Sequence, residues 1–469
     1  MTRKNGKQIL HYAVFGVLAL VSLMIFHICY KYHFFIQEQN CVFIFSRQSV
    51  AEYFGQNAWL VRLTGDFLTQ FFYYLYAGPA ITSAIILAVA VECHRCLKKI
   101  IGDTASFAAT VMAEVFLFFV VFNNGFKIDF LLTVIVGALA ADIYSSIFKK
   151  RRCWTAVAVI AILYYLAGFA QIVFAGFCAL MMLRERRLTD FLIVPAVALV
   201  IPVFGHRIFQ TTYGRNVLYP GVYAPALPDS HAELSYAIAT EYYFRHFGKV
   251  EQLALRQDTM TAQSGIYYNM VQAQKGVLPD KIQEQKIPEL GTLVHIDQNS
   301  PTEAVNLMND FYFLIGDMAM AERAAIMASV FSPDNRNVKM LKRLCEINLV
   351  TGDTAVALKY VRILEKTLLY KDWAQKHNPY LLDADVAKEI AEKRKFLNRS
   401  KNIRLNDDCR EILIELLESN PDNIIALDYL LCTDLILGQR QTFKADYYKY
   451  CVQKGRQRLT KLYIEALAK

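Results

Sequence analysis

The chain has 469 residues, of which 55% are hydrophobic and only 20% charged, and its mean hydropathy is +0.25. Residues 1–206 hold only 27 of the 93 charged residues (17 Lys and Arg, 10 Asp and Glu), so the apolar character is concentrated there. This composition excludes secreted, fibrous and wholly cytosolic proteins, because ordinary soluble domains are less apolar. The net charge of +9 arises mainly beside the apolar runs, which favours membrane orientation over a nucleic-acid partner.

Apolar runs in residues 1–206 predict a polytopic helix bundle in a lipid bilayer. The first run is long enough to cross about 30 Å of hydrocarbon, and no small residues follow it as in a cleaved signal peptide, so it predicts an uncleaved anchor. The run at 155–183 predicts two short helices that turn near Gly168. The seven segments are expected at about 10–30, 71–92, 104–122, 128–146, 155–167, 171–183 and 190–205.

The basic residues between these runs predict the orientation of the bundle. With a hairpin at 155–183, thirteen Lys and Arg lie on the cytoplasmic side and four lie outside, as the positive-inside rule requires. A single crossing there changes the distribution to ten against seven and returns the C-terminal half to the cytoplasm. We therefore expect a cytoplasmic N-terminus and an extracytoplasmic C-terminal half, with six segments as the alternative.

The outer loop at 36–66 carries the acidic residues of greatest chemical interest. Its apolar residues recur at intervals of three and four, which is typical of helices on the bilayer surface. Glu38 and Asp66 bracket the loop and are candidates for a general base or a metal ligand. Alternatively, Asp66 caps a helix and Glu38 is a solvated loop residue.

A Gly- and Pro-rich linker at 207–230 precedes a helical region at 231–469 that contains an internal repeat. Gly316-Asp317 recurs as Gly352-Asp353 within similar flanking residues, at an offset of 36 residues. This pattern resembles the tetratricopeptide repeat, which implies stacked helix pairs. The residues at its aromatic, small, small and proline positions are Tyr312, Ala321, Ala328 and Pro333. Residues 366–405 do not fit and predict an irregular insertion.

The repeat resemblance implies a concave surface that binds a protein or peptide partner, because one helix of each pair lines the groove. In this register Glu303, Asn306, Asp310 and Phe313 line the groove. The alternative is that all four are ordinary solvated positions on a helix face.

Two further resemblances concern the membrane half. Glu38-Gln39 and the segment at 65–73 resemble an uncharacterised family of bacterial multi-pass membrane proteins with helical tails, which implies a bacterial inner-membrane location. An acidic residue after the first helix, with surface helices in the same loop, is similar to membrane glycosyltransferases of the GT-C fold. That resemblance implies a lipid-linked sugar donor and a catalytic role for Glu38 or Asp66.

Other motifs are weak. Cys93 and Cys96 have the spacing of a redox or zinc half-site, but no second pair lies nearby. The sequence contains no Gly-rich phosphate loop and no His-Glu-x-x-His motif, so we expect no cofactor and no bound metal. The sequence predicts an all-α protein: a membrane helix bundle followed by a tetratricopeptide-like α-solenoid. We expect a scaffold or binding protein that presents this solenoid, with a GT-C-like glycosyltransferase as the alternative.

Overall fold

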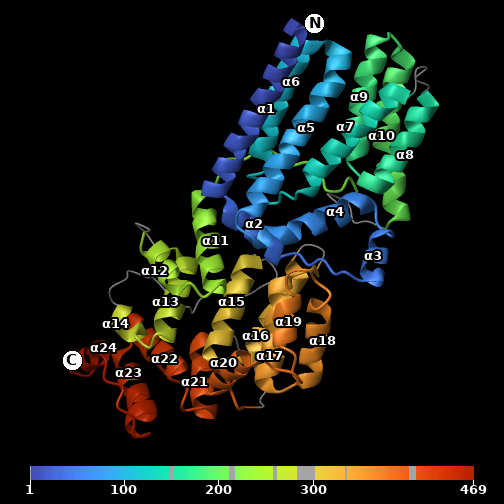
Figure 1. Ribbon diagram of the computed structural model, residues 1–469. Coiled ribbons are helices and arrows are strands. Elements are labelled where there is room, and N and C mark those ends of the chain that lie inside the picture. Colours follow the sequence, from blue (N-terminus) through green and yellow to red (C-terminus); the bar gives the residue numbers. More distant parts are fainter. Residues whose placement is uncertain are drawn as a thin grey trace. The chain divides into compact units, whose positions relative to one another are not determined.

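The computed structural model of the protein describes residues 2–147, 153–210, 217–256, 261–282, 302–332, 335–400 and 408–468. Within these residues the protein is entirely helical, without a strand, as the sequence predicts (Figure 1). They form two compact units. Unit 1 is Met1–Glu38 and Phe43–Glu233, which includes the expected linker, and unit 2 is Gln39–Val42 and Leu234–Lys469.

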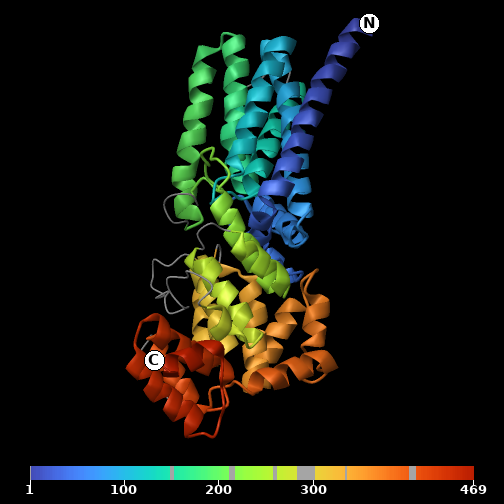
Figure 2. The same cartoon turned by 90° about the vertical axis from the view of Figure 1, so that its left-hand side faces the viewer.

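Unit 1 is a bundle of long apolar helices, and α1 lies at its edge (Figure 2). Five helices are long and apolar enough to cross a membrane, which is compatible with the expected membrane protein. They are α1 (Thr2–Cys29, with its apolar span from Gly6), α5 (Ala77–Ile101), α6 (Asp103–Val120), α7 (Asp129–Ile147) and α10 (Leu188–Ile208).

The second of these helices begins later than the sequence pattern indicates. The aromatic residues expected to open it form the short 3-10 helix η1 (Gln70–Tyr73), and α5 starts at Ala77. Pro79 lies in the first turn of α5, where a backbone without an N–H group leaves no hydrogen bond unmade. The helix then continues to Ile101, which brings Cys93, His94 and Cys96 into its last turns.

Residues 153–184 form a helical hairpin. Helices α8 (Cys153–Ala167) and α9 (Ala170–Arg184) each have 15 residues, and Gly168 joins them at φ +55°. A Cβ atom on Gly168 would lie 2.3 Å from the carbonyl oxygen of Tyr219, so this turn requires glycine. Each arm is about 22 Å long. Their crossing of the membrane stays a prediction.

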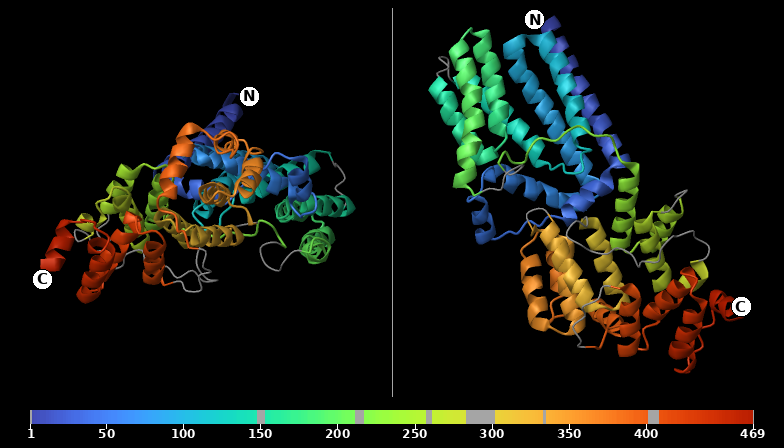
Figure 3. Two further views of the ribbon diagram at one scale, coloured as in Figure 1. Left: turned by 90° about the horizontal axis from the view of Figure 1, so that it is seen from below. Right: turned by 180° about the vertical axis from the view of Figure 1, so that it is seen from behind.

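Shorter helices run across one end of the bundle (Figure 1, Figure 3). They are α2 (Lys31–Gln39), α3 (Arg47–Tyr53) and α4 (Trp59–Thr69). Beneath them lies an aromatic core in which Phe34 packs edge to face on Phe26 and Phe72, with ring centroids 6.0 and 5.2 Å apart. Aromatic pairs in this geometry contribute stabilisation beyond that from burial of the rings, so they stabilise the packing of α2 on the bundle.

Unit 2 consists of shorter helices joined by tight turns. They are α11 (Ser230–Tyr243, shared with the end of unit 1), α12 (Phe247–Leu255), α13 (Ala262–Gln274), α14 (Leu278–Lys281), α15 (Thr302–Ile315), α16 (Met318–Phe331), α17 (Val338–Thr351), α18 (Thr354–Leu364), α19 (Lys371–Lys376), α20 (Ala384–Arg394), α21 (Cys409–Ser419), α22 (Ile424–Ile436), α23 (Arg440–Tyr447), the π-helical η3 (Tyr448–Val452) and α24 (Lys461–Ala468).

The sequence repeat corresponds to two helix pairs, α15–α16 and α17–α18. Gly316 and Gly352 lie between the helices of each pair with φ of +89° and +92°, a conformation that glycine adopts without strain. The following Asp317 and Asp353 cap the second helices by accepting backbone N–H bonds through their side chains. Residue Pro333 of the repeat pattern lies outside the described residues.

The segment that does not fit the repeat supplies caps for both pairs. Lys393 in α20 donates to the carbonyl oxygen of Leu314 at 3.0 Å, and Arg394 donates to those of Val350 and Leu349. These carbonyls end α15 and α17, where helices leave acceptors unpaired and favour positive charge. The insertion therefore packs against the repeats instead of looping away from them.

The two turn glycines form a matched pair of test positions. We expect Gly316→Ala to destabilise the protein by about 2–4 kcal/mol, because a Cβ atom there would lie 1.9 Å from Phe396 O and the φ is left-handed. Gly352→Ala meets nothing within 4 Å and should cost only about 1 kcal/mol for the φ. Urea midpoints of the two purified variants measure this difference, and equal losses would contradict it.

Candidate active site

Two carboxylates, those of Asp66 and Asp129, come together at the end of the bundle that α4 crosses. Asp66 lies within α4 and is half-buried, whereas Asp129 begins α7 and is only 2% exposed. Gly65 makes this approach possible, because a Cβ atom there would lie 1.6 Å from Asp129 Oδ1. Any side chain at position 65 would displace the Asp129 carboxylate from α4.

Each carboxylate accepts a hydrogen bond from a tyrosine hydroxyl. Tyr53 in α3 donates to Asp66 Oδ2 at 2.6 Å, and Tyr219 donates to Asp129 Oδ2. Hydrogen bonds from a hydroxyl to a carboxylate are short and strong, so the tyrosines orient the two acids. Asp66 is half-buried and Asp129 is enclosed, so Asp66 is the more exposed of the two carboxylates.

Two cations accompany the acids. The guanidinium of Arg62 lies 3.3 Å from the ring centroid of Tyr219, and its Nε donates to the carbonyl oxygen of Asn57 at 3.0 Å. Lys127 Nζ lies 5.7 Å from the same ring, and both cations act electrostatically on Asp129. The site therefore combines carboxylates that can accept a proton with cations that can stabilise a phosphate.

The segment after α10 completes the site. Residues 217–226 return to the bundle, where Tyr164 donates to the carbonyl oxygen of Val217 at 3.1 Å and the backbone N–H of Phe169 donates to that of Tyr219 at 3.0 Å. These bonds hold the ring of Tyr219 between Arg62 and Asp129. The site thus depends on contacts between residues 50 to 157 positions apart in the chain, which local sequence patterns do not reveal.

Glu38 belongs to a different part of the same surface. It lies in α2, is only 2% exposed and is therefore not a solvated loop residue. Burial, followed by the negative charges of Glu38 and Tyr74, raises the pKa of the Tyr73 hydroxyl. Among the described contacts, Asp66 is brought together with Tyr53 and Asp129, and Glu38 with Tyr73.

Asp66 does not cap a helix, which was the alternative prediction, because it lies well inside α4. Asp129 was missed by sequence reasoning. Its one signal was its place at the start of an apolar run, directly after the basic residue Lys127 and Ile128. A carboxylate near the end of an apolar run often has only a structural role. The close approach of α4 is what distinguishes Asp129 from such residues.

The helix that carries Glu38 is held in place by a further acid, the half-buried Glu233. Glu233 Oε1 and Oε2 accept the backbone N–H groups of Tyr32 and His33 at 2.8 and 3.1 Å, at the start of α2. A carboxylate at a helix N-terminus satisfies unpaired donors and complements the helix dipole. Burial nevertheless dominates and raises the pKa of Glu233 to about 8.

The four expected groove residues all lie on α15 in unit 2. Asp310 is buried, and its carboxylate accepts from Lys339 at 2.7 Å and from Arg343 at 2.8 Å. Burial by itself would raise the pKa of Asp310, but these two cations hold it below its ordinary value. Asn306 is also buried, whereas Glu303 and Phe313 are half-buried, and the binding role of all four stays a prediction.

The raised pKa of Glu233 generates a pH prediction. Between about pH 4.5 and 8 the unfolded chain releases this proton while the folded chain retains it, so folding becomes less favourable as the pH rises. Glu233→Gln removes this dependence. The urea midpoint of the variant should therefore rise relative to that of the wild type from pH 5 to 8. Glu389→Gln is the control, because its lowered pKa places its titration below this window.

Comparison with known protein families matches the chain to a family. No curated protein matches the chain, and no solved structure matches it. The match covers residues 7–469, which is nearly the whole chain, so it includes both units and both Asp66 and Asp129. It agrees with the expected membership of an uncharacterised family. The chain belongs to the family described as "Family of unknown function (DUF6057)".

Proposed function

We propose that the protein is a membrane glycosyltransferase that moves a sugar from a lipid-phosphate donor to an acceptor at the Asp66–Asp129 site. The observation that carries this proposal is an accessible carboxylate fixed by Tyr53, next to cations, at the end of an apolar bundle. The helices α2 to α4 lie across that end and include the loop whose sequence is similar to that of GT-C transferases. A bacterial inner membrane, with this site on its outer face, is part of the proposal.

The chemistry assigns a role to each group. Asp66 accepts the proton of an acceptor hydroxyl, whose oxygen then forms a bond to the anomeric carbon of the sugar. The bond between that carbon and the phosphate oxygen breaks, and the phosphate leaves with the lipid. Arg62 and Lys127 stabilise the charge that develops on the departing phosphate, and Asp129 holds Tyr219 and these cations in place.

Substitution of the base tests the transferase proposal. In purified protein reconstituted in lipid nanodiscs, Asp66→Asn should lower sugar release from a panel of polyprenyl-phosphate sugars by about 100-fold or more. Asp190→Asn is the matched control, because Asp190 pairs with Arg187 at the start of α10, at the opposite end of the bundle. Turnover by Asp66→Asn equal to that of the control would exclude Asp66 as the base.

The second candidate is a scaffold function for unit 2. The observation that favours it is the recurrence of a helix pair around Gly316 and again around Gly352. Stacked helix pairs of the tetratricopeptide type present surfaces to peptides and proteins. A scaffold and a transferase differ in one respect: partner binding by unit 2 should survive Asp66→Asn, whereas transfer should not.

The proposed orientation is testable with a membrane-impermeant thiol reagent on spheroplasts. Cys96 is fully buried and is a poor reporter, so exposed positions are needed. In a variant whose native cysteines are replaced, Glu52→Cys in α3 should be labelled, and Arg186→Cys after α9 should be labelled only after lysis. Labelling of Arg186→Cys in intact spheroplasts would place the Asp66 site on the cytoplasmic side.

A further inference from the structure

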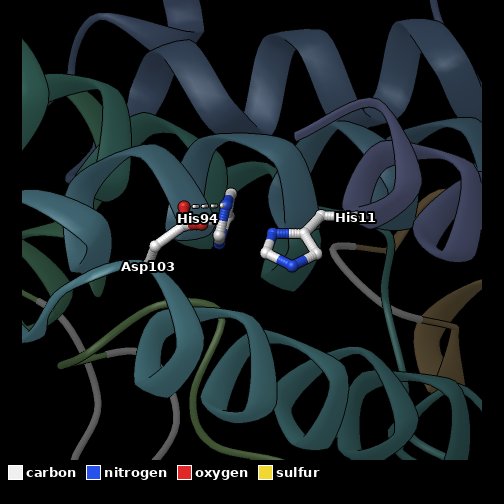
Figure 4. Close-up of side chains that lie close together, drawn as sticks. All are labelled: His11, His94 and Asp103. Carbon is white, nitrogen blue, oxygen red and sulfur yellow. Dashed lines mark ion pairs between the residues drawn. The ribbon is translucent and has the colours of Figure 1, made fainter. Parts of the chain in front are cut away.

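We propose that His11, His94 and Asp103 form a binding site for a divalent transition-metal ion, with Zn²⁺ the best fit. The three residues come from α1, α5 and α6, and Figure 4 shows their side chains gathered between these helices. One ligand atom from each residue lies within 4.8 Å of the others. The site lies at the end of the bundle opposite α4 and is independent of the proposed transferase function.

A hydrogen-bond chain fixes the tautomer of His94. The Ser106 hydroxyl donates its only proton to the carbonyl oxygen of Asp103 at 2.8 Å, so its oxygen accepts from His94 Nδ1 at 3.2 Å. The Nδ1 atom of His94 therefore carries the proton, and Nε2 presents a lone pair. Metal-binding histidines are typically held in this way, with the other ring nitrogen bonded to a neighbour.

The lone pair of His94 faces another acceptor. His94 Nε2 lies 4.0 Å from Asp103 Oδ1, the pair joined by the dashed line in Figure 4. The His94 side chain is buried, and among the described residues neither its Nε2 nor the Nδ1 of His11 has a hydrogen-bond partner. Acceptors that face one another repel unless a cation lies between them, and buried polar atoms rarely lack partners.

Lys98 is the cation that competes for this position. Its Nζ lies 2.6 Å from Asp103 Oδ1, and both side chains are about one-third exposed. An ammonium group has only donors and can satisfy the carboxylate, but at this position it leaves both histidine nitrogens without partners. A metal ion binds all three acceptors at once, and the long side chain of Lys98 can then turn outward.

The donor set selects the metal. Two imidazole nitrogens and one carboxylate oxygen are typical zinc ligands, and three protein ligands leave a fourth position for water. In a tetrahedral zinc site, donor atoms lie about 3.4 Å apart, so binding contracts the observed spacing by up to about 1.4 Å. This contraction pulls α1 toward α5 and α6, so the ion ties the N-terminal helix to the bundle.

A second cluster of possible ligands, between α5 and α7, shows the contrast. Glu92, Cys96 and Asp142 also lie close together, but Arg95 pairs with both carboxylates and Lys99 pairs with Asp142 at 2.5 Å. The Cys96 thiol donates to the carbonyl oxygen of Ala138. The cations balance both carboxylates of this cluster, although Glu92 Oε1 has no hydrogen-bond partner among the described residues. The metal-binding residue of the segment that contains the two cysteines is therefore His94.

Metal titration of the full-length protein tests the site. Protein purified in detergent without a polyhistidine tag and stripped with a chelator should bind one equivalent of Zn²⁺. It should also give the visible absorption of tetrahedral Co²⁺, and Zn²⁺ should raise its thermal midpoint. His94→Gln and His11→Gln should weaken binding at least 100-fold, and Ser106→Ala should weaken it about 10-fold through loss of tautomer control.

The matched control is His27→Gln, which removes an exposed histidine from the other end of α1 and should bind like the wild type. The proposal is overturned if the wild-type protein binds no Zn²⁺ at 100 µM. It is also overturned if His94→Gln binds as tightly as His27→Gln. The Co²⁺ spectrum of the wild-type protein reports the ligand geometry directly and needs no variant. An octahedral spectrum without imidazole ligation would therefore contradict the site even if a variant fails to fold.

Discussion

The close approach of α4 to the start of α7 is the constraint on which the acidic site depends. It exists because Gly65 has no side chain, so that the Asp129 carboxylate lies against the backbone of α4. An enclosed carboxylate there needs donors, and Tyr219 supplies one. The segment that carries Tyr219 must in turn pack on the α8–α9 turn, where only Gly168 leaves room. The missing side chains of Gly65 and Gly168 thus allow α4, the start of α7 and the segment that carries Tyr219 to pack together.

The sequence predicted the all-helical fold because the signals for it are local. Runs of apolar residues identify helices without knowledge of their neighbours, and a glycine in a long run, such as Gly168, indicates where it turns. The Gly-Asp turns of unit 2 are equally local, since left-handed φ and an N-cap specify residue types directly. Helix ends were less predictable: aromatic residues near Tyr73 favour both an apolar helix and the 3-10 turn that the structure contains.

The candidate site was predicted only in part. The outer loop indicated Asp66, because acidic residues beside a membrane are rare enough to attract attention. Its partner Asp129 and the two tyrosines join it through packing between distant segments, which one sequence does not encode visibly. The surroundings of Asp310 could not be derived from its register alone: its carboxylate is enclosed by Lys339 and Arg343 from α17, and its place in a binding groove stays a prediction.

In three acidic clusters of unit 1, different partners compensate the negative charge of a buried or half-buried carboxylate. Asp142 is balanced by Arg95 and Lys99, whereas Asp129 is balanced by hydroxyl and guanidinium groups. Asp103 has a lysine too, but that lysine cannot also satisfy the two histidine nitrogens beside the carboxylate. The extra lone pairs beside Asp103 create a local demand for positive charge that a divalent ion meets.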